Sequence, residues 1–413
     1  MPVRYIPPTP DALMAVPGIS LGTTAAKIKN WSRDDVVLIV AEPGTVAAGV
    51  FTQNRFCAAP VTICRRHLRE QHARGLDFRA LVINAGNANA GTGEAGMADA
   101  HAACVKTAQI VGCSPEEVLA FSTGVIMEPL PVARIVEGLP MARDAARAAG
   151  WFAAANAIMT TDTVPKGASR RVEVDGVPVT VTGMAKGAGM IHPDMATMLA
   201  FVATDAPIAA PLLASLAREV ADVSFNGATV DGDTSTNDSF VIAATGKAPL
   251  APLANASDPR LAAVRKAIEA VAVDLAQAIV RDGEGATKFI AIRVEGGHDV
   301  AECRRVAFGI AHSPLVKTAF FASDPNLGRI VCAIGNTAPD DLDASRVSFW
   351  LDDTLVVDHG GRAASYREED GQRVMKQDEI EIRVDLGRGR ARATVWTCDF
   401  SHEYVSINAD YRS

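Results

Sequence analysis

The stretch from residue 183 to residue 203 changes character at one peptide bond, and the residues there suit nucleophilic chemistry. Residues 183–190 contain three glycines and Lys186, whereas residues 195–203 are mostly apolar. At the junction stand Ala196 and Thr197, a small residue followed by a hydroxyl nucleophile. If the Thr197 hydroxyl attacks the Ala196 carbonyl, the chain rearranges to an ester that water can cleave. Thr197 would then be an N-terminus whose α-amine, with an ordinary pKa of about 7.7–8.0, can act as general base for its own hydroxyl.

An alanine followed by a threonine also has plainer explanations. A threonine in an apolar segment is more often a packed strand residue, because β-branched side chains fit a pleated surface. Lys186, between small residues, can equally be a solvated side chain. The pattern therefore predicts an acyl-transfer site only if other parts of the chain provide an oxyanion hole and groups that hold a substrate.

Two other polar segments could contribute to such a site. Residues 122–126, STGVI, follow an apolar run and could offer the Thr123 hydroxyl and the Gly124 amide to an oxyanion, or could be an ordinary polar turn. Residues 84–91, NAGNANAG, precede a predicted helix. This loop could bind an anion at the helix N-terminus, or form a tight turn with asparagines in left-handed conformations.

The hydrophobic pattern predicts the elements that must position these residues. Apolar runs bounded by turn residues indicate strands, and amphipathic stretches with capping residues indicate helices. A hairpin turn is expected at Asp175-Gly176. Strands are predicted at 36–41, 46–52, 80–84, 170–174, 177–182, 199–203 and 289–294, and helices at 59–72, 94–111, 211–223, 259–281 and 300–311.

Two further signals concern helix ends. Ser114 and Glu117 form a capping box, which predicts a helix start. The alanine-rich helices over 131–158 are expected to break at Pro140. Alternating strands dominate the C-terminal part of the chain. Together these features favour an α/β layered sandwich of mixed, largely antiparallel sheets with helices on the outer faces.

Composition narrows the class of protein. The 413 residues are 48% hydrophobic and 21% charged, as in ordinary globular proteins, and a net charge of −8 without a basic stripe argues against a nucleic-acid partner. No apolar run approaches the length of a membrane span, so a cytoplasmic protein with no membrane partner is expected. The chain has seven cysteines and no Cys-x-x-Cys spacing, which predicts that the cysteines are reduced thiols. Asp231, Asp233 and Asp238 lack the order of a calcium loop, so no metal is expected.

Motifs along nearly the whole chain resemble one family. GMAKGAGM at 183–190 followed by MATML at 195–199 is similar to the self-cleavage region of the ornithine acetyltransferase family, also called bifunctional glutamate N-acetyltransferase. The other resembling segments, in chain order, are 84–91, 122–126, MTTDT at 159–163 with the proline and lysine at 165–166, TVDGDTSTND at 229–238, RDGEGATK at 281–288, DPNLGR at 324–329 and YVSINADYRS at 404–413.

The resemblance implies a function and a set of site residues. It implies that Thr197 receives an acetyl group from N2-acetylornithine and passes it to glutamate in a ping-pong reaction of arginine biosynthesis. Thr123 and Gly124 would stabilise the oxyanion. Lys186 could pair with a substrate carboxylate and Glu284 with a substrate ammonium. The substrate-binding positions implied by the resemblance are Thr160, Lys186, Thr197, Glu284, Asn408 and Ser413.

The resemblance also implies an organisation. Cleavage would divide the chain into an α chain, 1–196, and a β chain, 197–413, assembled as a heterotetramer with two copies of each. We expect the two chains to stay associated because the β-rich C-terminal part has too few helices to cover its sheet. No cofactor is required, although acetyl-CoA would be a second acetyl donor in a bifunctional enzyme. Two positions depart from the family pattern: Met127, where glycine is more usual, and Leu327, where tryptophan is more usual.

Two rival functions remain open at this stage. A self-cleaving N-terminal-nucleophile aminopeptidase or amidase would share the cleavage but pass the acyl group to water. An uncleaved binding or structural protein would have no catalysis, and replacing Thr197 would change nothing measurable. The segments 281–288 and 404–413 favour the acetyltransferase, by resemblance alone.

Overall fold

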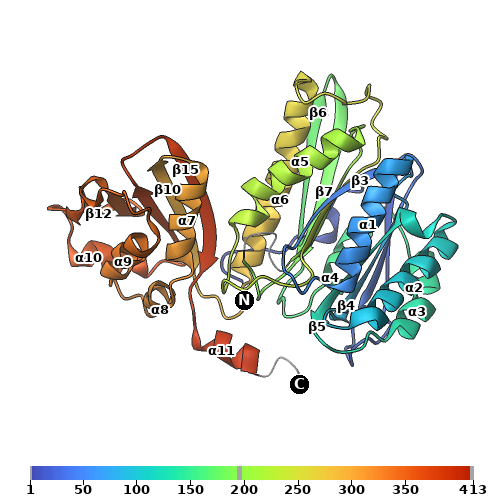
Figure 1. Cartoon of the computed structure of the whole chain (residues 1–413), viewed down its shortest axis with the longest axis horizontal. Coiled ribbons are helices and arrows are strands. Elements are labelled where there is room, and N and C mark those ends of the chain that lie inside the picture. Colours follow the sequence, from blue (N-terminus) through green and yellow to red (C-terminus); the bar gives the residue numbers. More distant parts are fainter. Residues whose placement is uncertain (1, 193–197, 410–413) are drawn as a thin grey trace. The chain divides into compact units, whose positions relative to one another are not determined.

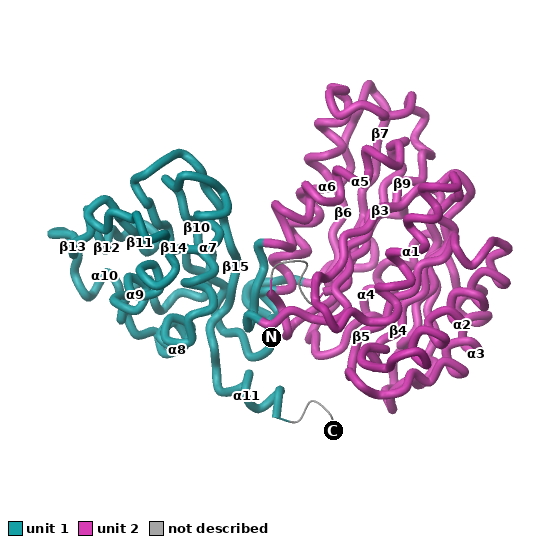
Figure 2. Tube along the Cα trace, in the orientation of Figure 1, with its two compact units in different colours: residues 1–6, 227–232, 280–413 teal, residues 7–226, 233–279 magenta. Residues whose placement is uncertain are grey.

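The computed structural model describes residues 2–192 and 198–409, which form two compact units (Figure 2). The layered unit comprises residues 7–226 and 233–279, and the C-terminal unit comprises 1–6, 227–232 and 280–413. Each unit has its own sheet system and hydrophobic core. No helix among the described residues is long and apolar enough to span a membrane.

The layered unit contains two sheets. The four-stranded sheet has the order β1-β2-β4-β5, and the five-stranded sheet has the order β3-β9-β8-β7-β6. Each contains one parallel pair, β4 with β5 and β8 with β9, and its other pairs are antiparallel. The strands are β1 (Ile19–Thr24), β2 (Val36–Ala41), β3 (Val46–Phe51), β4 (Ala80–Asn87), β5 (Val118–Val125), β6 (Lys166–Val174), β7 (Val177–Lys186), β8 (Leu199–Thr204) and β9 (Ser239–Ala244).

The two sheets pack face to face, with helices on their outer faces (Figure 1). Between the sheets the rings of Phe121 and Phe201 meet edge to face, with centroids 5.0 Å apart. Outside the four-stranded sheet lie α1, α2 and α3, and outside the five-stranded sheet lie α5 and α6. The helices are α1 (Ala59–Arg74), α2 (Gly93–Val111), α3 (Val132–Asp144), α4 (Trp151–Ala157), α5 (Ala210–Val223) and α6 (Pro259–Arg281).

The C-terminal unit is built on a six-stranded sheet of order β13-β12-β11-β14-β10-β15, in which only the pair β10 with β14 is parallel among the described residues. Its strands are β10 (Phe289–Gly297), β11 (Ser348–Leu351), β12 (Thr354–Asp358), β13 (Gly361–Arg362), β14 (Glu379–Asp385) and β15 (Ala391–Cys398). Its helices are α7 (Val300–Ala311), α8 (Pro314–Ala322), α9 (Gly328–Thr337), α10 (Glu368–Met375) and α11 (His402–Ala409).

The predicted fold class is confirmed, as are most predicted elements. The hairpin between β6 and β7 turns through Asp175 and Gly176, whose φ angles of 50° and 77° lie in the left-handed region that this turn requires. The helix start predicted at 114–117 is wrong. The capping box forms, but it closes only a single 3₁₀ turn before the chain enters β5.

Two other expectations also need correction. Pro140 lies inside α3, and the break between α3 and α4 falls after Asp144 instead. The helices α8, α9, α10 and α11 were not predicted. Because α7, α8, α9 and α10 bury residues against the C-terminal sheet, that sheet is covered by its own helices and the reason given above for chain association is wrong.

The structure supplies a different reason. β6 and β7 precede residue 196, whereas β8 and β9 follow residue 197, and all four belong to the same sheet. β8 pairs with β7 over six residue pairs from Val181↔Thr204 to Lys186↔Leu199. Chains divided at 196/197 would therefore still share the hydrogen bonds and apolar faces of this sheet.

Candidate active site

The C-terminal end of β7 brings Lys186 to Thr123 of β5. Lys186 Nζ donates to Thr123 Oγ1 at 2.8 Å, and both side chains are buried. A lysine ammonium has no acceptor, whereas a hydroxyl has one donor and two lone pairs. The proton of the Thr123 hydroxyl therefore points away from Lys186 and is available to another acceptor. This is the arrangement that an oxyanion donor needs.

Asp162 provides the negative charge beside these groups. Its fully buried carboxylate accepts from Lys166 Nζ at 2.6 Å, from the Gly187 amide at 2.7 Å and from the Thr160 amide at 3.0 Å. Burial alone would raise the pKa of Asp162, but the charges of Lys166 and Lys186 outweigh it and hold that pKa well below its ordinary value. Asp162 is therefore ionised, and its carboxylate holds the backbone at Thr160 and at Gly187.

Gly124, next to Thr123, is fixed by close packing of backbone on backbone. Its φ is 133°, a region that L residues with side chains avoid. A Cβ at this position would lie 2.2 Å from the Gly86 carbonyl carbon and 2.5 Å from the Asn87 nitrogen. Only glycine fits here, on an edge strand where half of the backbone groups are not used by the sheet.

Strand β8 begins beside the same groups. Lys186 is opposite Leu199 in the antiparallel pair, and the Ser239 amide donates to the Met198 carbonyl at 3.0 Å. Thr197 precedes Met198 in the chain. Ala196 and Thr197, the predicted cleavage site and nucleophile, lie outside the described residues.

Asp238, which the sequence suggested only as a loop acid, lies directly before β9. Its side chain is fully buried, and neither carboxylate oxygen has a hydrogen-bond partner of good geometry among the described residues. Burial raises the pKa of Asp238 well above its ordinary value, although the nearby charge of Lys186 opposes the shift. The pKa of Asp238 is therefore raised and that of Asp162 is lowered, although both carboxylates feel the charge of Lys186. Only the position of Asp238 between a polar loop and an apolar strand could have signalled its burial.

The residues predicted in the C-terminal part are placed in the C-terminal unit. Asn408 Nδ2 donates to Glu284 Oε2 at 2.8 Å, and Glu284 is buried. The structure thus brings these two predicted residues together. Ser413 lies outside the described residues.

The asparagine-rich loop at 84–91 has a structural role. Asn89 adopts a φ of 47°. Its side-chain Nδ2 donates to the Gly96 carbonyl at 2.9 Å, its Oδ1 accepts from Thr92 Oγ1 at 2.8 Å, and its backbone N–H donates to Asn87 Oδ1 at 2.8 Å. Asn237, which the sequence reading missed, joins this loop to β5 through bonds to the Ala88 and Ser122 carbonyls at 2.6 and 2.9 Å. The turn interpretation therefore accounts for this loop.

Metal ligation has no geometric support in the described part of the chain. No three His, Cys, Asp or Glu side chains lie close enough together there to hold a metal ion.

Asp231, one of the acids of the loop at 229–238, accepts a hydrogen bond within the C-terminal unit. The donor is the Tyr404 hydroxyl, 3.4 Å from Asp231 Oδ2.

Comparison with known proteins gives this geometry a context. A sequence model of the ArgJ family matches residues 20–413, nearly the whole chain. The chain belongs to the ArgJ family. ArgJ proteins are acyltransferases of arginine biosynthesis, so the buried Lys186–Thr123 pair lies in an enzyme that transfers acyl groups.

Two solved structures are similar over part of the chain. The arginine biosynthesis bifunctional protein argJ of Bacillus halodurans is 37% identical, with a TM-score of 0.48, over 51% of this chain and 97% of that one. The ornithine acetyltransferase of Mycobacterium tuberculosis, solved with ornithine, is 35% identical, with a TM-score of 0.39, over 44% of this chain and 95% of that one.

Met127 and Leu327, the two departures from the family pattern, lie in different environments. Met127 has a φ of 66° and an exposed side chain, so a methionine occupies a backbone conformation that favours glycine. Leu327 is buried at the start of α9 in the core of the C-terminal unit. It borders a cavity of about 550 Å³ together with Phe349 and Tyr366.

Proposed function

We propose that this ArgJ protein transfers the acetyl group of N2-acetylornithine to glutamate through an acetyl ester on Thr197. The observation that carries the proposal is the convergence of Lys186, Thr123 and the start of β8 in one buried place. Thr197 is two residues before Leu199, the first residue of β8. The proposal requires the Thr197 hydroxyl to act beside the Thr123 hydroxyl donor, since acyl transfer needs a nucleophile and an oxyanion donor at the same carbonyl.

The first half-reaction consumes N2-acetylornithine. Thr197 Oγ attacks the acetyl carbonyl while the Thr197 α-amine takes the hydroxyl proton. The oxyanion accepts hydrogen bonds from the Thr123 hydroxyl and the Gly124 amide. When the tetrahedral intermediate collapses, the carbon–nitrogen bond breaks and the ammonium protonates the departing nitrogen of ornithine. The acetyl group remains on Thr197 as an ester.

The second half-reaction reverses these steps with glutamate. Its amine attacks the ester carbonyl, the same donors hold the oxyanion, and Thr197 leaves with its proton restored. Lys186 would pair with a substrate carboxylate, and Glu284, positioned by Asn408, would take the ammonium of the ornithine side chain. Thr160 and Ser413 complete the proposed binding set. No cofactor enters either step, and acetyl-CoA would act only as an alternative donor.

Self-cleavage between Ala196 and Thr197 must precede both steps, because only a free α-amine can serve as the base. The shared sheet of β6, β7, β8 and β9 supports association of the resulting α and β chains. We infer an assembly of two copies of each chain from the family resemblance.

The test is product analysis with matched variants. The wild type should convert N2-acetylornithine and glutamate to ornithine and N-acetylglutamate, with parallel double-reciprocal lines. Thr197→Ala should abolish transfer, whereas Thr197→Ser should retain part of it. Release of acetate at the same rate with and without glutamate would instead identify an amidase. Intersecting lines would contradict the ester intermediate.

A further inference from the structure

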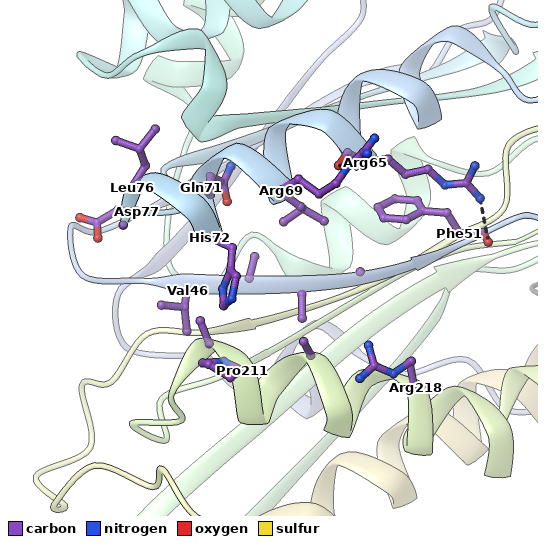
Figure 3. A pocket seen from close by; sticks show the side chains of 17 residues that line it. Val46, Phe51, Arg65, Arg69, Gln71, His72, Leu76, Asp77, Pro211 and Arg218 are labelled. Atoms are coloured by element: carbon purple, nitrogen blue, oxygen red, sulfur yellow. Dashed lines mark hydrogen bonds between the residues drawn. The ribbon is translucent and has the colours of Figure 1, made fainter.

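A groove outside the candidate active site runs along strand β3 in the layered unit. β3 is the outermost strand of its sheet, and among the described strands it pairs only with β9. Helix α1 flanks the strand on one side and helix α5 on the other, and their side chains face each other across it (Figure 3). The cavity between them has a volume of about 880 Å³.

The floor of this groove is a free strand edge. The Thr52 amide donates to the Asp238 carbonyl at 2.9 Å, so the N–H at position 52 points towards the β9 side. Because orientation alternates along an antiparallel pair, Ala47, Gly49 and Phe51 point theirs outwards. Arg65 donates to the Phe51 carbonyl at 3.4 Å from that side. No described residue forms a hydrogen bond with the outward N–H or C=O of Ala47 or Gly49.

Apart from the Arg65 side chain at Phe51, this edge lacks the sequence features that usually protect against strand addition. Exposed edges in folded proteins normally carry a charged residue or a proline, or are twisted away by a bulge. β3 reads VAAGVF, and its register with β9 is regular over all six residues. The strand therefore presents a template for a further strand.

The groove is also locally basic in a chain whose net charge is −8. Arg65 and Arg69 line it from α1, and Arg218 lines it from α5 (Figure 3). Against these three arginines the lining contains one carboxylate, that of Asp77, which accepts from the Gly44 amide at 2.8 Å. Within the described ranges no carboxylate lies at ion-pair distance from any of these three guanidinium groups. On the same helix α1, by contrast, Arg66 and Arg74 both pair with Glu70, at 4.0 and 3.8 Å.

We propose that the groove binds an extended acidic peptide segment of another protein, which adds to β3 as a sixth strand. Backbone hydrogen bonds to Ala47 and Gly49 would supply the affinity that strand addition gives, and the arginines would select acidic side chains. A second copy of this chain fits less well, because a two-fold contact through this groove would bring its own arginines against those of the partner.

The experiment measures binding of a defined probe to the full-length protein by fluorescence anisotropy. The probe is a fluorescein-labelled hexapeptide of alternating glutamate and valine. One control peptide replaces glutamate by lysine, and another carries N-methyl groups on alternate backbone amides at unchanged charge. The acidic peptide should bind, and each control should bind at least about tenfold more weakly, the change expected when one or two hydrogen bonds or ion pairs are lost.

Variants test the site. Ala47→Pro removes an outward N–H that the β9 pair does not use, and Arg69→Glu and Arg218→Glu reverse exposed charges of the groove. Each substitution should weaken binding of the acidic peptide by about tenfold, while the rate of acetyl transfer and the unfolding midpoint stay unchanged. Arg143→Glu on α3 has the same charge change away from the groove and should bind the probe as the wild type does.

Several results would overturn the proposal. One is equal binding of the N-methylated and unmodified peptides, which would indicate a general anion site. Another is undiminished binding to Ala47→Pro. A third is light scattering that shows a dimer of the wild type and a monomer of Ala47→Pro, which would assign the edge to a second copy. Loss of acetyl transfer in Thr197→Ala with unchanged peptide binding would separate this site from the proposed catalytic one.

Discussion

Lys186 Nζ and Thr123 Oγ1 lie 2.8 Å apart, and both side chains are buried, although the two residues are 63 positions apart in the chain. The ammonium can only donate, so it fixes the direction of the Thr123 hydroxyl proton and polarises it towards a further acceptor. The pair therefore connects a residue proposed to hold substrate with one proposed to stabilise the oxyanion. Perturbing either one should affect the reaction more than the fold.

Thr123→Val keeps the shape of the side chain and removes the donor. We expect kcat to fall by about 10²–10³, the usual effect of losing one oxyanion donor, with KM for N2-acetylornithine little changed. Thr123→Ser should recover much of the loss because it restores the hydroxyl. Steady-state kinetics of the three proteins would measure this, and a kcat within threefold of wild type in Thr123→Val, on the order of 0.6 kcal/mol, would exclude Thr123 from the oxyanion hole.

Gly124→Ala should destabilise the layered unit by several kcal/mol, because its Cβ would lie 2.2 Å from the Gly86 carbonyl carbon. Gly93→Ala is the matched control. Gly93 also has a positive φ, of 60°, but nothing lies within 4 Å of a Cβ there, so its cost should be about 1 kcal/mol. Urea unfolding midpoints would compare them. Similar midpoints for both variants would show that the contact with Gly86 is not restrictive.

Asp238 should make stability depend on pH. Its folded pKa is raised by burial, so the folded state binds the proton more tightly than the unfolded state does. The stability of the wild type should therefore fall relative to Asp238→Asn as the pH rises from about 4, the ordinary aspartate pKa, towards neutrality. Thermal unfolding of both proteins across this range would show it. A constant difference at all pH values would mean that Asp238 ionises normally in the fold.

Asp162 should make stability depend on pH in the opposite direction to Asp238. Its folded pKa is held low by Lys166 and Lys186, so its contribution is present above the ordinary aspartate pKa of about 3.9 and is lost only as the pH falls below it. Asp162→Asn should cost about 3–5 kcal/mol because it removes the buried carboxylate that pairs with the Lys166 ammonium. The double variant Asp162→Asn/Lys166→Met should recover part of this loss in urea unfolding. Additive losses would indicate that the two residues do not interact.

Met127→Gly should stabilise the protein by about 1 kcal/mol, because methionine is strained at a φ of 66° and its exposed side chain has little packing to lose. The gain is offset in part by the larger entropy of an unfolded chain with glycine. Thermal melts of wild type and variant would measure it. A lower melting temperature in the variant would show that the Met127 side chain contributes packing of its own.

The sequence predicted the elements whose pattern is local and strong. Helix 300–311 and strand 36–41 match the structure at both ends because turn and capping residues bound them closely. Ser114 with Glu117 shows the limit of such signals, since the capping box formed and yet tertiary pairing of β5 with β4 drew the following residues into a strand. The side chains of Ser114 and Glu117 determined the 3₁₀ turn, whereas pairing with β4 determined that the residues after it form a strand.

The candidate site was predictable only in part. Thr123, Gly124 and Lys186 were named from motifs, and Lys186 and Thr123 do meet. The buried states of Asp162 and Asp238 were not predicted, because burial of a charge depends on strands that are distant in sequence. The free edge of β3 likewise follows from the strand order, which no local pattern encodes.

The measurement that tests the central claim most directly is the denatured intact mass of the purified protein, before and after incubation with N2-acetylornithine in the absence of glutamate. The account predicts two species, residues 1–196 and 197–413, and a mass increase of one acetyl group on the second species alone. Added glutamate should remove that increase. A single 43.3 kDa species that never gains mass would contradict both the cleavage and the acetyl-threonine intermediate.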